Sequence, residues 1–131
     1  MASLGTAFLQ EEFEKAAALR ERFSGCCKAV GDTGPSADTV AGAIARHLAD
    51  TLGTELPAAA QVIWHDRIVR PLKADAAKPL TPRAIGQIRS WPLSRVGDLA
   101  RALIDIEAIL VDYENEVHHE VIYAEISRTY S

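Results

Sequence analysis

The sequence has few of the features that mark specialised protein classes. It holds two cysteines among 131 residues, and these are the neighbours Cys26 and Cys27, which rarely meet the geometry of a disulfide. A disulfide framework is therefore excluded, and a reducing, cytoplasmic compartment is the simpler interpretation. No apolar run approaches the roughly 20 residues that cross a bilayer, and the first residues lack the pattern of a signal peptide. We expect a cytoplasmic protein without a membrane partner.

Glycine and proline are also sparse, and their placement indicates the fold class. The chain has eight glycines and six prolines, and neither residue occurs after Gly97. A composition of 48% apolar and 24% charged residues is ordinary for a globular domain, and a chain of this length can bury one independent core. No alternating apolar pattern predicts a strand. The sequence therefore predicts a single all-α domain over residues 1–131, a helical bundle of about five helices with a long C-terminal helix.

Breaks between the apolar stretches place the ends of the helices. Ser36 or Asp38 can cap a second helix and Gly53 can end it, while Thr81 and Pro82 form a cap followed by a first-turn proline. Between these signals, apolar residues three and four positions apart indicate helical faces. The predicted helices cover residues 6–30, 37–52, 57–70, 82–91 and 95–127.

The last predicted helix carries the clearest pattern in the chain. Its apolar positions alternate spacings of three and four residues over three heptads, as in the seam of a coiled coil. Seven residues form this seam: Val96, Leu99, Leu103, Ile106, Leu110, Tyr113 and Val117. A helix over residues 95–127 is roughly 50 Å long, whereas a globule of this size has a radius of gyration of about 14 Å. Part of the helix must protrude, bend or pack on another chain, unless a turn near Asn115 divides it; the absence of glycine and proline favours a continuous helix.

Charge changes sign along the C-terminal half of the chain. Residues 64–101 hold eight Lys or Arg against three Asp or Glu, whereas residues 102–131 hold one against seven. The cations near Trp64 and Trp91 raise the question of nucleic acid, because cations neutralise phosphates and aromatic rings stack on bases. They are scattered over several helices and form no known reader motif. The pattern favours an acidic protein partner, for example residues 105–125 of another copy, and leaves nucleic-acid contact as the less favoured alternative.

Two sets of residues have the composition of a metal site. Glu116 and His119 have the Glu-x-x-His spacing of di-iron bundles, but those proteins need the motif twice, so a solvated helix surface is the better explanation. The second set follows the order of helical metal phosphohydrolases: His47, His65, Asp66 and either Asp105 or Asp112. Such a set would hold a divalent ion that activates water against a phosphate. A small metal-dependent helical phosphohydrolase is therefore the alternative function.

The segment 81–128 resembles a known family. It contains the string Gln87-Ile88-Arg89-Ser90-Trp91, then an amphipathic stretch with Ala102, Leu103 and the acidic Glu107, then Glu120-Val121-Ile122 at the start of an apolar run to Ile126. These features are similar to the C-terminal helical domain of the bacterial DNA polymerase III delta subunit, especially in its actinobacterial form. Residues 36–52 are compatible with the preceding helix of that domain.

The resemblance implies a role in assembly. In that family the domain is a helical bundle that forms the collar of a clamp loader in DNA replication, and it holds subunits together without catalytic residues of its own. This chain has no room for the ATPase-like modules, Val111 stands where the family has a lysine, and the link before Glu120 is shorter. These departures imply a stand-alone relative or an excised domain.

We therefore expect a non-catalytic helical module for protein–protein interaction, with a protein partner or as a homo-oligomer, and without a cofactor. The predicted interface consists of the seven seam residues together with Arg89 and Trp91. Whether the seam contacts another chain or forms the internal core stays open at this level, because an apolar heptad stripe has the same spacing in both cases.

Overall fold

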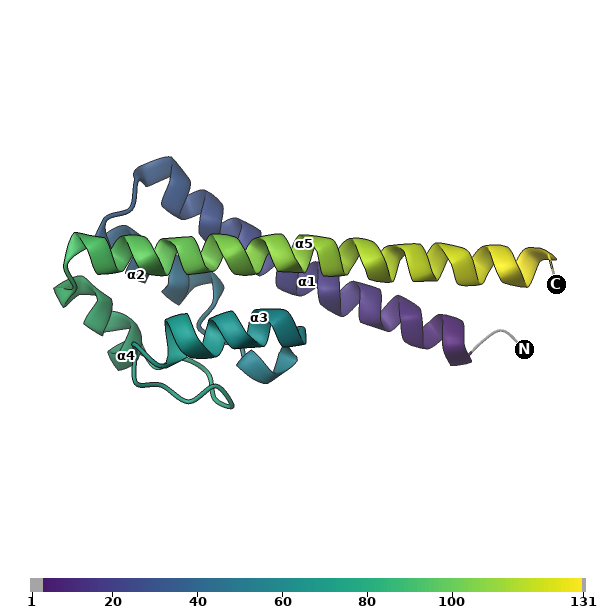
Figure 1. Cartoon of the computed structure of the whole chain (residues 1–131), viewed down its shortest axis with the longest axis horizontal. Helices are drawn as coiled ribbons and strands as arrows, with labels where there is room; N and C mark the ends of the chain where they lie inside the picture. Colours follow the sequence, from purple (N-terminus) through teal and green to yellow (C-terminus); the bar gives the residue numbers. More distant parts are fainter. Residues whose placement is uncertain (1–3, 131) are drawn as a thin grey trace.

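Two long antiparallel helices organise the molecule, and the shorter elements pack around one end of the pair (Figure 1). The computed structural model describes the backbone of residues 4–130 and the side chains of residues 7–32 and 34–127. The long helices are α1 (Leu4–Thr33) and α5 (Leu93–Tyr130). The shorter elements are α2 (Ala37–His47), η1 (Gly53–Glu55), α3 (Ala58–Ile63), η2 (Trp64–Val69), α4 (Pro82–Gly86) and η3 (Gln87–Ser90). Residues 4–130 contain no strand, so the predicted all-α bundle with a long C-terminal helix is confirmed.

Helix α5 runs without interruption through Asn115, where a turn was the alternative. Its 38 residues correspond to about 57 Å. Because this exceeds the extent of the packed core, its C-terminal half projects beyond the short elements, beside the N-terminal half of α1 (Figure 1). We call residues 7–20 and 111–127 the arm, and residues 21–110 the head.

The predicted caps are present at two helix starts. The Ser36 hydroxyl accepts a hydrogen bond from the Thr39 amide at 3.1 Å, and the Thr81 hydroxyl accepts one from the Ala84 amide at 3.1 Å. Each bond satisfies an amide that has no partner inside the first turn. Pro82 follows the second cap in the first turn, where its missing N–H removes no helical bond.

Helix α2 ends at His47 rather than at the predicted residue 52. The next residues turn into the head, where Thr51 is fully buried and its hydroxyl accepts a hydrogen bond from Arg22 at 3.1 Å. The Gly53 amide then donates to the Ala76 carbonyl at 2.9 Å, which ties this turn to the connector that follows η2. These tertiary hydrogen bonds replace the last turn of the predicted helix.

The third predicted helix, residues 57–70, contains a change of winding. Helix α3 has α geometry, but η2 is a π-helix in which the Arg70 amide donates to the His65 carbonyl at 2.9 Å. A π turn holds more residues than an α turn and rotates the following side chains around the axis. As a result Trp64, Ile68 and Val69 all face the core.

The head contains one apolar core to which nearly every element contributes. Its largest fully buried side chains are Trp64, Phe23, Ile44, Leu48, Ile68, Leu72, Ile88, Leu99, Leu103, Ile106 and Leu110. In the arm only α1 and α5 remain, and a narrower strip is buried between them, formed by Ala16, Leu19, Val117 and Val121. The core of the head is thus covered by several elements, whereas the arm consists of two helices.

The backbone of Gly53 lies directly against the indole of Trp64, so this position has no room for a side chain. A Cβ at residue 53 would lie 2.5 Å from Trp64 Cδ1. We expect Gly53→Ala to lower the free energy of unfolding by about 1–3 kcal/mol, because the indole must shift inside a packed core. Gly86→Ala is the matched control, since a Cβ there meets nothing within 4 Å. Urea denaturation followed by circular dichroism measures both, and equal stability of the two variants would contradict the packing described.

Candidate interaction surfaces

The seam predicted as an interface lies inside the chain's own fold. Six of its seven residues are buried, from Val96 to Val117, and Tyr113 is partly buried. In the head the seam packs on the other elements of the core, and in the arm Val117 faces α1. In this conformation these side chains are not exposed to a second chain, so the surfaces available for interaction lie elsewhere.

The two other predicted interface residues make intramolecular contacts at the surface of the head. The Arg89 guanidinium donates to the Asp38 carboxylate at 3.1 Å, and both side chains are more than half exposed. Trp91 is partly buried against the core, and the guanidinium of Arg95 lies 4.0 Å from its ring centroid. Arg89 thus joins η3 to the start of α2, while Trp91 lines a concave surface of the head.

The structure does not bring the proposed metal ligands together. His65 and Asp66 are exposed on η2, and Asp105 forms an ion pair with Arg67 at 2.6 Å. His47 lies against Gly25, between α1 and α2. Within the part of the chain that the structure describes, no three His, Cys, Asp or Glu side chains converge in a way that could hold a metal ion. Asp105 is instead paired with Arg67, and His47 and His65 belong to separate elements.

Of the two histidines of the arm, His118 contacts α1 and His119 is exposed on the surface of α5. His118 packs its ring against Phe13 of α1 with centroids 5.0 Å apart, while Glu116 and His119 are exposed on the other side of α5. The i, i+3 pair of Glu116 and His119 has no second motif facing it among the described residues. These residues therefore form part of the helix surface.

The adjacent cysteines are poorly suited to reactive chemistry. Cys26 is buried in the head and Cys27 is partly buried, and both thiols are free. Burial raises the pKa of each thiol to about 12, with Glu107 adding to the effect. Because the thiolate is the reactive form, both side chains behave as small apolar groups near neutral pH.

The tip of the arm exposes an apolar groove, which we call the arm-tip surface. Seven residues line it: Leu9, His119, Glu120, Ile122, Tyr123, Ala124 and Ile126. The groove has a volume of about 610 Å³. Tyr123 is 74% exposed, Ile126 49% and Ile122 40%, and Phe8 beside Leu9 is 60% exposed. Large apolar side chains therefore gather in the part of the molecule where only two helices are present.

Side-chain contacts hold the two helices of the arm together. Arg20 of α1 forms an ion pair with Glu114 of α5 at 2.6 Å, and both side chains are mostly shielded from solvent. The hydrogen bond to Glu114 raises the pKa of Arg20 further above its usual value. Together with the Phe13–His118 ring contact, this pair fixes the register of the two helices. The arm-tip surface consequently lies on two helices, α1 and α5, that are held together by these contacts.

The arm is strongly acidic. Residues 7–20 and 111–127 together hold eight Asp or Glu against two Lys or Arg. On α5, Glu116 and Glu120 are exposed, and they lie on the same side of the helix as Tyr123 because spacings of four and three residues return to one face. The apolar groove at the tip is thus bordered by carboxylates.

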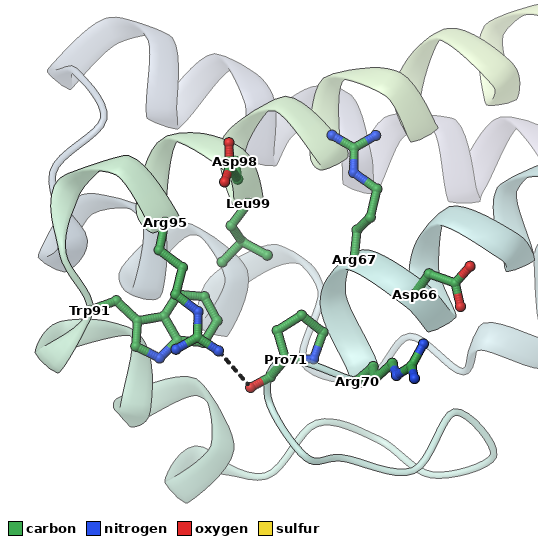
Figure 2. Close-up of a pocket in the computed structure, with 8 residues that line it drawn as sticks. All are labelled: Asp66, Arg67, Arg70, Pro71, Trp91, Arg95, Asp98 and Leu99. Carbon is green, nitrogen blue, oxygen red and sulfur yellow. Dashed lines mark hydrogen bonds between the residues drawn. The ribbon is translucent and has the colours of Figure 1, made fainter.

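A second concave surface lies on the head, and we call it the Trp91 pocket (Figure 2). Eight residues line it: Asp66, Arg67, Arg70, Pro71, Trp91, Arg95, Asp98 and Leu99. Its volume is about 490 Å³. The lining combines an aromatic ring and aliphatic groups with three guanidinium groups and two carboxylates.

The three arginines of the Trp91 pocket differ in their partners. Arg67 is paired with Asp105, and Arg95 lies over the Trp91 ring and donates to the Pro71 carbonyl at 3.4 Å (Figure 2). The guanidinium of Arg70 is exposed and has no ion pair with any side chain that the structure describes. Arg70 and the outer edge of Arg95 are therefore the groups best placed to meet an acidic ligand.

Comparisons with protein-family models, curated proteins and solved structures find no match to this chain. None of its described helices is long and apolar enough to span a membrane. The fold and surfaces define an all-helical protein with a head and an arm.

Sequence reasoning missed the arm-tip surface, although a signal for it is present. Val117 and Val121 continue the buried stripe, whereas Ile122, Tyr123 and Ile126 lie on other faces of the helix. A helix that is apolar on more than one side, late in its length, needs more than one neighbour to cover it. That second apolar face distinguishes the arm tip from the rest of the seam.

Proposed function

We propose that the protein is a non-catalytic helical assembly module that docks on a partner protein through its arm-tip surface. The head folds around its own core and holds α5 in place, while α1 and α5 carry the docking surface away from it. The observation that supports the proposal is the cluster of exposed large apolar side chains at the arm tip, formed by Ile122, Tyr123 and Ile126, which line one groove together with Leu9.

The physical argument concerns how many faces two helices can cover. Each helix of an isolated pair buries one stripe against its neighbour, here Val117 and Val121 on the α5 side. Exposing apolar groups on a further face to water costs free energy. A contiguous apolar patch with a polar rim is typical of interaction sites. A helix laid along the groove would bury this face, as in recognition of amphipathic helices by apolar grooves.

The resemblance of residues 81–128 suggests a more specific version of this proposal, a collar-type role in a clamp loader. It is supported by the string at residues 87–91 and by the helical pattern that follows. For this version we expect binding to purified clamp-loader subunits, with loss of binding when the arm tip is altered. Equal binding by the altered protein would remove the collar-type role.

The test of the proposal compares the mass of the wild type with that of an arm-tip variant. Light scattering at micromolar concentration should find the wild type in an oligomer or in a complex with a co-purified partner. Ile122→Ser/Ile126→Ser should weaken that association at least tenfold, because each truncation removes roughly 1 kcal/mol of apolar burial. A strictly monomeric wild type without a partner would contradict the proposal.

Val62→Ser provides the matched control. Val62 is 60% exposed, on α3 in the head, so its truncation removes a similar apolar group far from the arm tip. All three altered residues are at least 40% exposed, and we expect the free energy of unfolding to change by less than about 0.5 kcal/mol in either variant. Loss of association in the control as well would show that the arm tip has no special role.

A further inference from the structure

A basic stretch of the head and the arm carry opposite charge. The head end of the long axis contains the end of α1, α2, α4 and the start of α5, and the other end is the tip of the arm (Figure 1). Residues 64–101 of the head hold eight Lys or Arg against three Asp or Glu, the head as a whole (21–110) holds eleven against ten, and the arm holds two against eight. The basic stretch 64–101 and the arm are therefore segments of opposite charge.

The peptide dipole of α5 has the same direction as this charge separation. A helix has partial positive charge at its N-terminus and partial negative charge at its C-terminus, so acidic residues normally favour the first turn. The first turn of α5 contains no acidic residue and includes Arg95, whereas Glu116, Glu120 and Glu125 lie in its second half. These charges reinforce the dipole instead of offsetting it. Such a departure from local preference is typical of a functional surface.

Both surfaces also offer apolar contact area. The arm tip is a narrow two-helix end from which Tyr123 projects with 74% exposure. The Trp91 pocket is concave, with Pro71 and Trp91 offering apolar contact. Near it, Leu93 is 69% exposed on the first turn of α5. Both ends thus combine an apolar centre with charged borders of opposite predominant sign.

We infer that copies of this chain assemble head to tail, with the arm-tip surface of one copy seated on the Trp91 pocket of the next. In this contact the exposed carboxylates of Glu116 and Glu120 face the guanidinium groups of Arg70 and Arg95. Tyr123 and its apolar neighbours cover the Trp91 side of the pocket. The inference rests on the proposed function and specifies the partner as a second copy.

Charge decides between this contact and the pairing of two arms. Arm-to-arm pairing would also bury the apolar tips, but it would bring together two segments that each hold eight acidic residues against two basic ones. Like charges placed across an interface disfavour association, whereas opposite potentials favour it and fix the orientation. Contact between unlike surfaces is heterologous, so it adds copies in one direction until a ring closes or a filament forms.

The first part of the test reverses charges on each surface separately. The head variant is Arg70→Glu/Arg95→Glu and the arm variant is Glu116→Lys/Glu120→Lys; all four side chains are exposed, and circular dichroism checks that each variant is folded. Sedimentation velocity should show wild-type association that weakens about tenfold or more between 50 and 500 mM salt, as expected of exposed charges. Each variant alone should associate at least tenfold more weakly than the wild type, and Arg70→Glu alone should show a smaller loss in the same direction.

The second part mixes the variants. The head variant keeps a normal arm and the arm variant keeps a normal head, so their mixture should associate although neither variant does so alone. The reversed head and the reversed arm are complementary as well, so the mixed assembly can grow beyond a dimer. One chain that carries all four reversals should recover wild-type association, because both surfaces have exchanged sign. Failure of both the mixture and the fourfold variant to associate would overturn the head-to-tail contact.

Other outcomes separate this inference from the proposed function. If the head variant associates as well as the wild type while Ile122→Ser/Ile126→Ser does not, arms pair with arms; the docking role then stands and the head-to-tail contact is refuted. The same holds if the wild type alone is monomeric but binds a different protein through the arm tip. If association is unaffected by every arm variant, both the inference and the proposed function fail.

Discussion

Leu103→Ala is expected to lower the free energy of unfolding by about 2–5 kcal/mol without changing the mass of the protein in solution. Leu103 is 1% exposed and lies in the middle of the seam, where α5 crosses the core of the head. Truncation leaves a cavity that the surrounding helices fill only in part, so the loss exceeds the transfer free energy of the missing atoms. Denaturant unfolding and light scattering on the same sample measure the two quantities.

Ile104→Ala is the matched control for this prediction. Ile104 is the next residue on the helix and is 56% exposed, so we expect its truncation to change the free energy of unfolding by less than about 0.5 kcal/mol. The opposite result for Leu103, a loss of mass with little change in stability, would mean that the seam is a contact between chains. That outcome would contradict the packing of α5 within the head.

Trp64→Ala is expected to have the largest effect of any single truncation, a loss of about 3–5 kcal/mol. The indole is 1% exposed, packs edge-on against Phe23 with ring centroids 5.9 Å apart, and lies against the backbone of Gly53. Its removal deletes contacts that η2 makes with α1 and with η1. Because a domain of this size has a total stability of about 5–15 kcal/mol, the variant should be partly unfolded at moderate temperature.

His65→Ala serves as the control for Trp64→Ala. His65 is the next residue of η2 and is exposed, so its truncation should leave the melting temperature close to that of the wild type. Thermal unfolding followed by circular dichroism suits both variants, because helical signal does not depend on the removed fluorophore. A Trp64→Ala protein as stable as the control would show that the indole is not the centre of the core.

Much of the fold is predictable because its signals are local. Ser36 and Thr81 occupy N-cap positions, and their hydroxyls accept the amide hydrogen bonds expected of them. The continuity of α5 follows from a long stretch without glycine or proline, in which the heptad stripe extends to Val117. These features need no knowledge of distant residues, so the sequence alone indicates them.

The parts that could not be predicted depend on tertiary contacts. The π-helix from Trp64 to Val69 lets three apolar side chains reach the core together. The spacing of these apolar residues in the sequence does not predict a π turn in place of an α turn. Similarly, α2 ends at His47 because Thr51 is buried and bonded to Arg22, a residue of another helix. Helical propensity alone predicts a longer helix, to residue 52.

The candidate interaction surfaces also divide into a part that the sequence predicts and a part that depends on tertiary contacts. Sequence pattern identified the seam from Val96 to Val117 as an important apolar surface, but a stripe of this spacing fits an internal core as well as an interface. The structure places it inside the fold. The arm-tip surface emerges only when the number of neighbouring helices is known, because Ile122 and Ile126 are exposed for lack of a third helix and not for lack of apolar character.

The most direct test of the central claim is size-exclusion chromatography with light scattering and a melting curve on three proteins, the wild type, Leu103→Ala and Ile122→Ser/Ile126→Ser. The arm-tip variant should lose mass relative to the wild-type assembly and keep its melting temperature. Leu103→Ala should keep its mass, at a temperature where it is folded, and melt lower. The reverse assignment, with assembly lost in Leu103→Ala and retained in the arm-tip variant, would contradict a docking role for the arm.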